Sequence, residues 1–280
     1  MSQPCNSPTR NFLINVCNKF HVNLQEGVYL FKVLLGKTGL HVSRLCIGTD
    51  YSDIYGGSPI GVRILLRGAE LGVNFWDTSE SYGSYPAIRR ALKELSRENI
   101  VITTKSYSKR IEGAKRDLED ALDGMDTDYV DIFMLHAVDD MNDFKRRKEV
   151  LRFLLDKKDE GTIRSIGVST HSASVISALT NMPEIEVVLA VLNIKGIRIK
   201  EGDLNLITSA LKRLYQSGKG VYLMKVLARG KLADRAMEAL TFGFKFAYAH
   251  SVAVGIKSIQ ELKFAVSVAE RTEKEACSGE

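Results

Sequence analysis

Cysteine is scarce and scattered in this chain of 280 residues. The four cysteines are Cys5, Cys17, Cys46 and Cys277. They form no CxxC pair, and their spacing suits neither a zinc site nor a disulfide framework nor an iron–sulfur cluster. We therefore expect no bound metal and a reducing compartment.

Proline and long apolar runs are also lacking. The chain has five prolines and no Ser/Gly-rich stretch longer than a turn, so nothing suggests a linker between domains. No apolar run approaches the roughly 18 residues that a membrane span needs, and residues 1–26 lack the apolar centre of a secretion signal. These absences predict one domain, no membrane partner and a cytoplasmic location. The first 25 residues contain no Asp or Glu, which leaves an organellar transit peptide open, although one Arg and one Lys are few for it.

No long block of one charge is present. The net charge of +5 is spread along a chain that is 45% hydrophobic and 26% charged, which is typical of a globular protein and argues against nucleic acid as a partner. The densest basic run, Lys145 to Lys148, lies in a helical pattern and is interpreted as a solvated helix face without a function.

From residue 44 onward, short β-rich apolar runs alternate with amphipathic segments at a spacing of about 30 residues. The predicted strands are Arg44–Gly48, Val73–Trp76, Ile100–Thr104, Tyr129–Leu135, Ile163–Val168, Glu186–Ala190, Gly220–Met224 and Ser251–Val254. The clearest predicted helices are Ile60–Leu71, Ala87–Ser96, Ala114–Met125 and Phe144–Glu160. Glycines follow several helical segments, where a left-handed residue ends a helix most easily: Gly72, Gly124, Gly161 and Gly218. Eight such units predict an α/β fold, a closed (β/α)8 TIM barrel.

The N-terminal part does not fit this repeat. Val28–Leu34 and Leu40–Val42 flank a turn at residues 36–39 and predict a hairpin that closes the floor of the barrel. We divide the chain into an N-terminal extension at 1–27, the barrel at 28–272 and a C-terminal tail at 273–280.

Polar residues stand where four consecutive predicted strands end. They are Asp77, Lys105, His136 and Ser169, each roughly 30 residues from the next, and Tyr82 lies in the loop after Asp77. Singly, each has a structural explanation as a cap, a solvated lysine, a core histidine or a rim aromatic. Because the active site of such barrels lies at the carboxyl ends of the strands, their conjunction favours one shared site.

Several segments together resemble the aldo-keto reductases over about residues 28–270. They are the hairpin string at residues 35–43, the string Asp77-Thr78-Ser79-Glu80-Ser81-Tyr82-Gly83, and the pairs Thr104-Lys105 and Leu135-His136, with Gly167-Val168-Ser169. By this resemblance the catalytic residues are Asp77, Tyr82, Lys105 and His136. The resemblance implies reduction of aldehydes or ketones to alcohols with NADPH as the cofactor.

The four residues suit that chemistry. A carbonyl that receives a hydride develops negative charge on oxygen, so the site needs a proton donor and a charge stabiliser. We expect Tyr82 to be the acid, Lys105 to lower its pKa, Asp77 to hold the ammonium, and His136 to donate a hydrogen bond to the carbonyl.

No GxGxxG motif follows a strand, so a Rossmann site is not indicated. The resemblance places the cofactor across the barrel mouth instead, with Ser169 and Asn193 on the nicotinamide and Lys257 and Ser258 on the 2′-phosphate. The full set of cofactor-binding residues that it implies is Gly48, Thr49, Asp77, Ser169, Asn193, Lys225, Leu227, Gly255, Lys257, Ser258 and Glu261. A turn role for Asn193 and a helix-cap role for Ser258 remain open.

The chain departs from the family pattern at a few positions. Ala265 stands where an Asn is common, Thr170-His171 replaces Asn-Phe, and Leu192 replaces a tyrosine. The long C-terminal substrate loop of classical members also has no counterpart, which predicts an open mouth for a small carbonyl substrate. The alternative function is a non-catalytic NADP(H)-binding barrel that acts as a redox sensor or as a subunit of an assembly.

Overall fold

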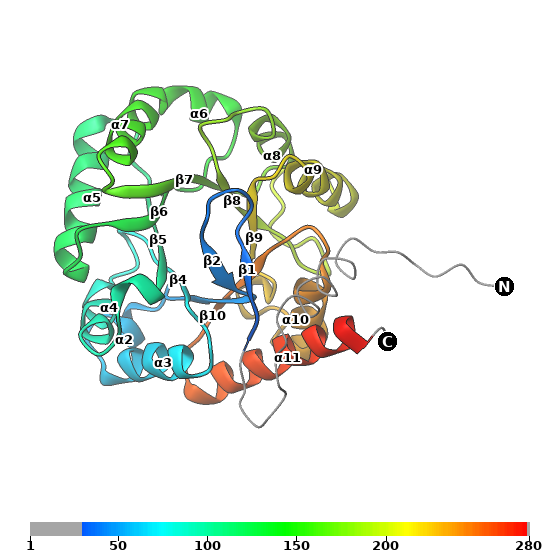
Figure 1. Ribbon diagram of the computed structural model, residues 1–280. Helices are drawn as coiled ribbons and strands as arrows, with labels where there is room; N and C mark the ends of the chain where they lie inside the picture. Colours follow the sequence, from blue (N-terminus) through cyan, green and yellow to red (C-terminus); the bar gives the residue numbers. More distant parts are fainter. Residues whose placement is uncertain (1–29, 279–280) are drawn as a thin grey trace.

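The computed structural model describes residues 30–278, so the N-terminal extension proposed at 1–27 lies outside the described residues. Eight parallel strands of this part form a closed barrel in the order β10-β3-β4-β5-β6-β7-β8-β9 (Figure 1). They are β3 (Leu45–Gly48), β4 (Phe75–Asp77), β5 (Val101–Ser106), β6 (Val130–Leu135), β7 (Ile163–Thr170), β8 (Val187–Val191), β9 (Gly220–Met224) and β10 (Ser251–Gly255). The predicted (β/α)8 barrel is confirmed, and each predicted strand overlaps an observed one.

The strands are buried on both faces, which is why they read as continuous apolar runs. In β3, Leu45 and Ile47 pack among the residues between sheet and helices, while Cys46 packs inside the barrel. The interior cluster also contains Phe75 and Tyr222, whose ring centroids lie 4.9 Å apart. The barrel interior is therefore a packed core below the mouth.

The predicted hairpin is present as β1 (Lys32–Leu34) and β2 (His41–Ser43), which pair antiparallel and cross the centre of the barrel in Figure 1. It lies at the floor, because the Lys37 amide donates to the carbonyl of Gly218, 2.9 Å away, just before β9 begins. Gly36 has a φ of 58°, and a Cβ there would stand 2.3 Å from the amide nitrogen of Gly220. Both the conformation and the close approach require glycine.

Helices surround the barrel (Figure 1). They are α2 (Ser52–Tyr55), α3 (Pro59–Glu70), α4 (Tyr85–Leu92), α5 (Ile111–Met125), α6 (Met141–Arg146), α7 (Lys148–Asp159), α8 (Ala173–Leu179), α9 (Leu204–Gln216), α10 (Ala236–Lys245) and α11 (Ile259–Ser278), with short 3-10 helices at Arg97–Asn99, Ala228–Gly230 and Ala233–Arg235. α11 runs without a break across residue 272, the predicted end of the barrel. No helix of residues 30–278 is long and apolar enough to cross a membrane.

The predicted helix-ending glycines are confirmed at Gly72, Gly161 and Gly218, which have positive φ angles. The expectation is wrong for Gly124, which lies inside α5, where Asp126 ends the helix with a φ of 59°. Gly124 is needed for packing instead, because a Cβ there would stand 2.9 Å from the ring of Tyr85 on α4.

The single helix predicted over Phe144–Glu160 is also wrong. It divides into α6 and α7 at Arg147, whose φ of −101° and ψ of 14° interrupt the helical backbone. The Arg147 side chain is 3% exposed, and its guanidinium donates to the Asp143 carboxylate at 2.6 Å and to the carbonyl of His136 at 2.8 Å. The basic run therefore contains one buried arginine that fixes the backbone of a mouth residue, and it is not wholly a solvated face.

Candidate active site

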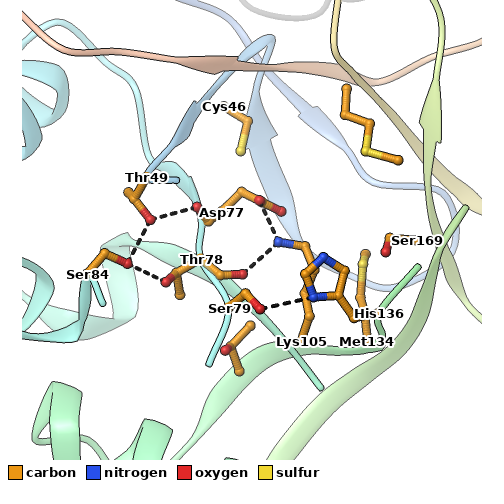
Figure 2. Close-up of polar contacts among 12 residues, drawn as sticks. Cys46, Thr49, Asp77, Thr78, Ser79, Ser84, Lys105, Met134, His136 and Ser169 are labelled. Carbon is orange, nitrogen blue, oxygen red and sulfur yellow. Dashed lines mark hydrogen bonds and ion pairs between the residues drawn. The ribbon is translucent and has the colours of Figure 1, made fainter. Parts of the chain in front are cut away.

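A buried ion pair joins the ends of β4 and β5. The Lys105 ammonium donates to Asp77 Oδ1 at 2.6 Å and to the carbonyl oxygen of Thr78 at 2.6 Å (Figure 2). Lys105 is 1% exposed and Asp77 is 5% exposed. The sequence predicted that both residues follow their strands. In the structure they belong to the strands, because Asp77 is the last residue of β4 and Lys105 is the fifth of the six residues in β5.

The second oxygen of Asp77 has a partner that the sequence did not indicate. The hydroxyl of Tyr222 on β9 donates to Asp77 Oδ2 at 2.7 Å from inside the barrel. Tyr222 is fully buried and reads in the sequence as an ordinary core aromatic. The carboxylate is thus held from two sides, by an ammonium and by a phenol.

Tyr82 lies beside this pair in the loop between β4 and α4. The Lys105 ammonium is 4.8 Å from the centroid of the Tyr82 ring, a cation–π contact, and no hydrogen bond joins it to the Tyr82 hydroxyl. Burial, together with the charge of Asp77, raises the pKa of Tyr82 above its ordinary value. The pKa of Tyr82 is thus raised and not lowered as expected, because burial and the charge of Asp77 outweigh an ammonium that makes no hydrogen bond to the hydroxyl.

His136 follows β6 on the other side of Tyr82. The two rings meet edge to face with centroids 6.0 Å apart, and the ring of Tyr107 stacks on His136 at 3.9 Å. His136 Nδ1 is 3.0 Å from Ser79 Oγ (Figure 2). Burial lowers the pKa of His136, so the ring is neutral at neutral pH. The structure therefore brings together the four residues that the sequence singled out as catalytic.

The residues at the end of β3 are part of the wall of this site. The Thr49 hydroxyl lies 3.0 Å from the carbonyl oxygen of Asp77 and 2.8 Å from Ser84 Oγ (Figure 2). Gly48 pairs with Asp77 across the sheet, and a Cβ on Gly48 would stand 3.3 Å from the carbonyl oxygen of Val254. Thr49 thus braces the backbone of Asp77.

Ser169 and Asn193 differ in whether their side chains keep a hydrogen-bonding group available for a ligand. Ser169 Oγ accepts from the amide of Ala137 at 2.7 Å and keeps its own proton for a further partner. The Asn193 amide group instead donates to the Ile197 carbonyl at 2.8 Å, and its oxygen accepts from the amides of Lys195 and Ile197. The geometry favours the turn role for Asn193.

Lys225 and His171 form a pair at the mouth. The Lys225 ammonium is 2.6 Å from His171 Nε2, and His171 Nδ1 is buried without a hydrogen-bond partner among the described residues. Burial and then the charges of Arg198 and Arg229 lower the pKa of Lys225 to about 8, and burial and Lys225 lower that of His171 to about 4. Leu227, two residues after Lys225, lies partly exposed at the start of the 3-10 helix Ala228–Gly230. No pattern in the sequence indicates that Lys225 and His171 pair.

The segment after β10 begins α11. Ser258 Oγ accepts from the amide of Glu261 at 3.1 Å, and Glu261 accepts from the amide of Lys257 at 2.7 Å, which is the reciprocal pattern of a helix cap. The ammonium of Lys257 lies 5.5 Å from the centroid of the Tyr51 ring and is exposed. Tyr51 packs on Gly255, where a Cβ would stand 2.8 Å from the tyrosine ring. Ser258 and Glu261 therefore serve the helix cap, while the Lys257 side chain stays accessible.

The geometry agrees with comparisons to known proteins. Residues 61–247 match the model of the Aldo/keto reductase family. The chain is 26% identical to L-galactose dehydrogenase of Arabidopsis thaliana over 85% of this chain and 80% of that protein. It is 27% identical to the NADH-specific methylglyoxal reductase of Escherichia coli over 57% of this chain and 58% of that protein.

Solved structures show the same fold. An aldo-keto reductase from Bacillus halodurans in its holo form superposes with a TM-score of 0.69 at 21% identity, covering 89% of this chain and 96% of that one. The chain belongs to the aldo/keto reductase family, whose members are oxidoreductases that act on small carbonyl compounds with a nicotinamide cofactor.

Proposed function

We propose that this protein reduces aldehydes or ketones to alcohols with NADPH, and that Tyr82 supplies the proton. One observation carries the proposal: a buried ion pair between Asp77 and Lys105 lies against Tyr82, whose ring in turn meets His136. A buried ion pair is a poor way to stabilise a fold, since desolvation offsets much of its Coulomb energy. Its place at the carboxyl ends of the strands, opposite the hairpin, supports a catalytic role.

Each side chain has a defined part in the reaction. The raised pKa of Tyr82 keeps its hydroxyl protonated at neutral pH, so it can donate to the oxygen of a carbonyl as negative charge develops there. The ammonium of Lys105 faces the Tyr82 ring and stabilises the phenolate that remains after the transfer. Asp77, held by Tyr222, fixes the ammonium in that place.

The mouth has donors that fit an anionic nicotinamide cofactor. Among the described residues, nothing takes up the hydroxyl proton of Ser169 or pairs with the buried Nδ1 of His171. The ammonium of Lys225 is repelled by the positive charges of Arg198 and Arg229, and a bound pyrophosphate would offset this repulsion. These residues would hold the cofactor, and the reduced nicotinamide supplies the hydride that no side chain can provide.

The choice of NADPH over NADH rests on Lys257. Its exposed ammonium makes no ion pair with any described residue and can meet the 2′-phosphate that distinguishes the two cofactors. Because the E. coli relative is named as NADH-specific, cofactor preference has to be measured for this chain.

The test is the loss of NADPH absorbance when purified protein meets a panel of aldehydes and ketones, with identification of the alcohol formed. Turnover with stoichiometric alcohol supports the proposal. Tight NADPH binding without turnover of any carbonyl would contradict it and favour a redox sensor or a subunit of an assembly.

A further inference from the structure

The loop that carries Tyr82 also brings a serine and a glutamate against His136. Ser79 Oγ lies 3.0 Å from His136 Nδ1 and forms a short hydrogen bond to Glu80 Oε2. Glu80 Oε2 is itself 3.8 Å from His136 Nδ1. Ser79 is fully buried and the Glu80 side chain is 18% exposed, so the three groups interact largely out of solvent.

Tyr107 holds the glutamate and the histidine in this relation. Its backbone amide donates to Glu80 Oε1 at 3.2 Å, while its ring stacks on the imidazole. Burial pushes the pKa of Glu80 upward, but the neighbouring His136 ring and hydrogen bonds from Ser79 and the Tyr107 amide outweigh it and leave the pKa below its ordinary value. Glu80 is therefore a carboxylate at neutral pH and can only accept hydrogen bonds.

The direction of each hydrogen bond follows from counting protons. Ser79 has one hydroxyl proton, and the carboxylate of Glu80 has none to give, so the hydroxyl must donate to Glu80. The oxygen of Ser79 can then only accept from His136, which requires a proton on Nδ1. The other charged groups that face the ring are Lys105 on β5 and Asp77 on β4, and neither makes a hydrogen bond to Nδ1.

We propose that Ser79 and Glu80 are positioning residues that hold the proton of neutral His136 on Nδ1 and so leave Nε2 without a proton. In the neutral ring Nε2 then accepts a hydrogen bond from a hydroxyl, and it donates to a carbonyl oxygen only when the ring has gained a second proton. This revises the expectation that His136 simply donates to the substrate, and its catalytic consequence rests on the proposed reductase function.

The first experiment reads the tautomer directly and needs no turnover. Long-range proton–nitrogen correlation spectra of the full chain with labelled histidine distinguish a protonated from a bare ring nitrogen, and the loss of signals in His136→Gln assigns the ring. At neutral pH the unmodified protein should show a protonated Nδ1 and a bare Nε2.

Two variants remove the constraint in different ways. Ser79→Ala deletes the acceptor, and Glu80→Gln supplies an amide that can donate to Ser79 and so free its hydroxyl to donate to Nδ1. Both should move the proton to Nε2. Ser81→Ala is the matched control, because this exposed serine lies 3.4 Å from Ser79 Oγ but does not contact the ring, and it should leave the spectrum unchanged. A protonated Nε2 in the unmodified neutral ring, or an unchanged tautomer in Ser79→Ala, would overturn the proposal.

The second experiment measures kcat for carbonyl reduction against pH. In the unmodified protein the rate should rise as pH falls through the pKa of His136, because only the doubly protonated ring donates from Nε2. In Glu80→Gln this limb should disappear, because the neutral ring then carries its proton on Nε2 and donates without a second one. A limb that persists unchanged in Glu80→Gln counts against the role in catalysis, whereas a protein that turns over no carbonyl fails the proposed function and leaves the spectral result standing.

Discussion

Breaking the ion pair beneath the mouth should cost stability as well as activity. In Lys105→Met the Asp77 carboxylate remains buried with only the Tyr222 hydroxyl as a donor, since Lys105 and Asp77 are 1% and 5% exposed. Removing one partner of a buried pair typically costs about 3–5 kcal/mol, because the other charge stays uncompensated. Asp77→Asn should also be destabilising, because it leaves the buried ammonium of Lys105 without its negative partner.

The double variant Asp77→Asn/Lys105→Met leaves neither charge buried. It should therefore be less destabilised than the sum of the two single variants, with a coupling of about 1–3 kcal/mol. Urea unfolding followed by circular dichroism gives the three free energies of unfolding.

An exposed pair on the same molecule provides the control. Lys200 and Asp139 lie 2.5 Å apart with side chains 53% and 48% exposed, so Lys200→Met should change the free energy of unfolding by less than about 1 kcal/mol. If Lys105→Met is as mild as Lys200→Met, or if the effects of the two buried substitutions simply add, then Asp77 and Lys105 do not compensate each other's buried charge.

Three further outcomes are expected. Burial raises the pKa of Glu273 to about 8 from an ordinary 4.5, so the stability that this group contributes is complete below about pH 4.5 and is lost as pH rises through about 8. Glu273→Gln should remove this part of the pH dependence of the free energy of unfolding, and an unchanged pH dependence would contradict the prediction. Lys257→Met should weaken NADPH binding by roughly 1.5–3 kcal/mol and leave NADH binding unchanged, whereas equal dissociation constants for both cofactors in the unmodified protein would exclude the role of Lys257. Metal analysis of the purified protein should find neither iron nor zinc in stoichiometric amount; one equivalent of either would show that the cysteines were misinterpreted.

The strand pattern made the barrel and most of the site predictable. Because parallel strands end at one edge of the barrel, spacing alone placed Asp77, Lys105 and His136 together. The break between α6 and α7 and the buried side chain of Arg147 could not be predicted in this way. The apolar periodicity continues through the break and does not show which side chain turns inward.

Other features depend on contacts that no local pattern encodes. Tyr222 is 145 residues from Asp77 in sequence, and an aromatic in a buried strand gives no sign of which polar group its hydroxyl meets. For Asn193, the contacts of its amide group with the Ile197 backbone depend on the fold of its own loop, which the sequence does not show. For Tyr82, the direction of the pKa shift was missed because the sequence shows neither how deeply the hydroxyl is buried nor how close the charge of Asp77 lies.

Tyr82→Phe is the sharpest test of whether Tyr82 donates the proton, because it keeps the ring and deletes the hydroxyl. Turnover of NADPH with a reactive aldehyde should fall by about 10² to 10⁴-fold, while the dissociation constant for NADPH, measured by fluorescence titration of the same preparations, should stay within about twofold. A Tyr82→Phe protein that reduces the aldehyde at the rate of the unmodified protein would contradict the account.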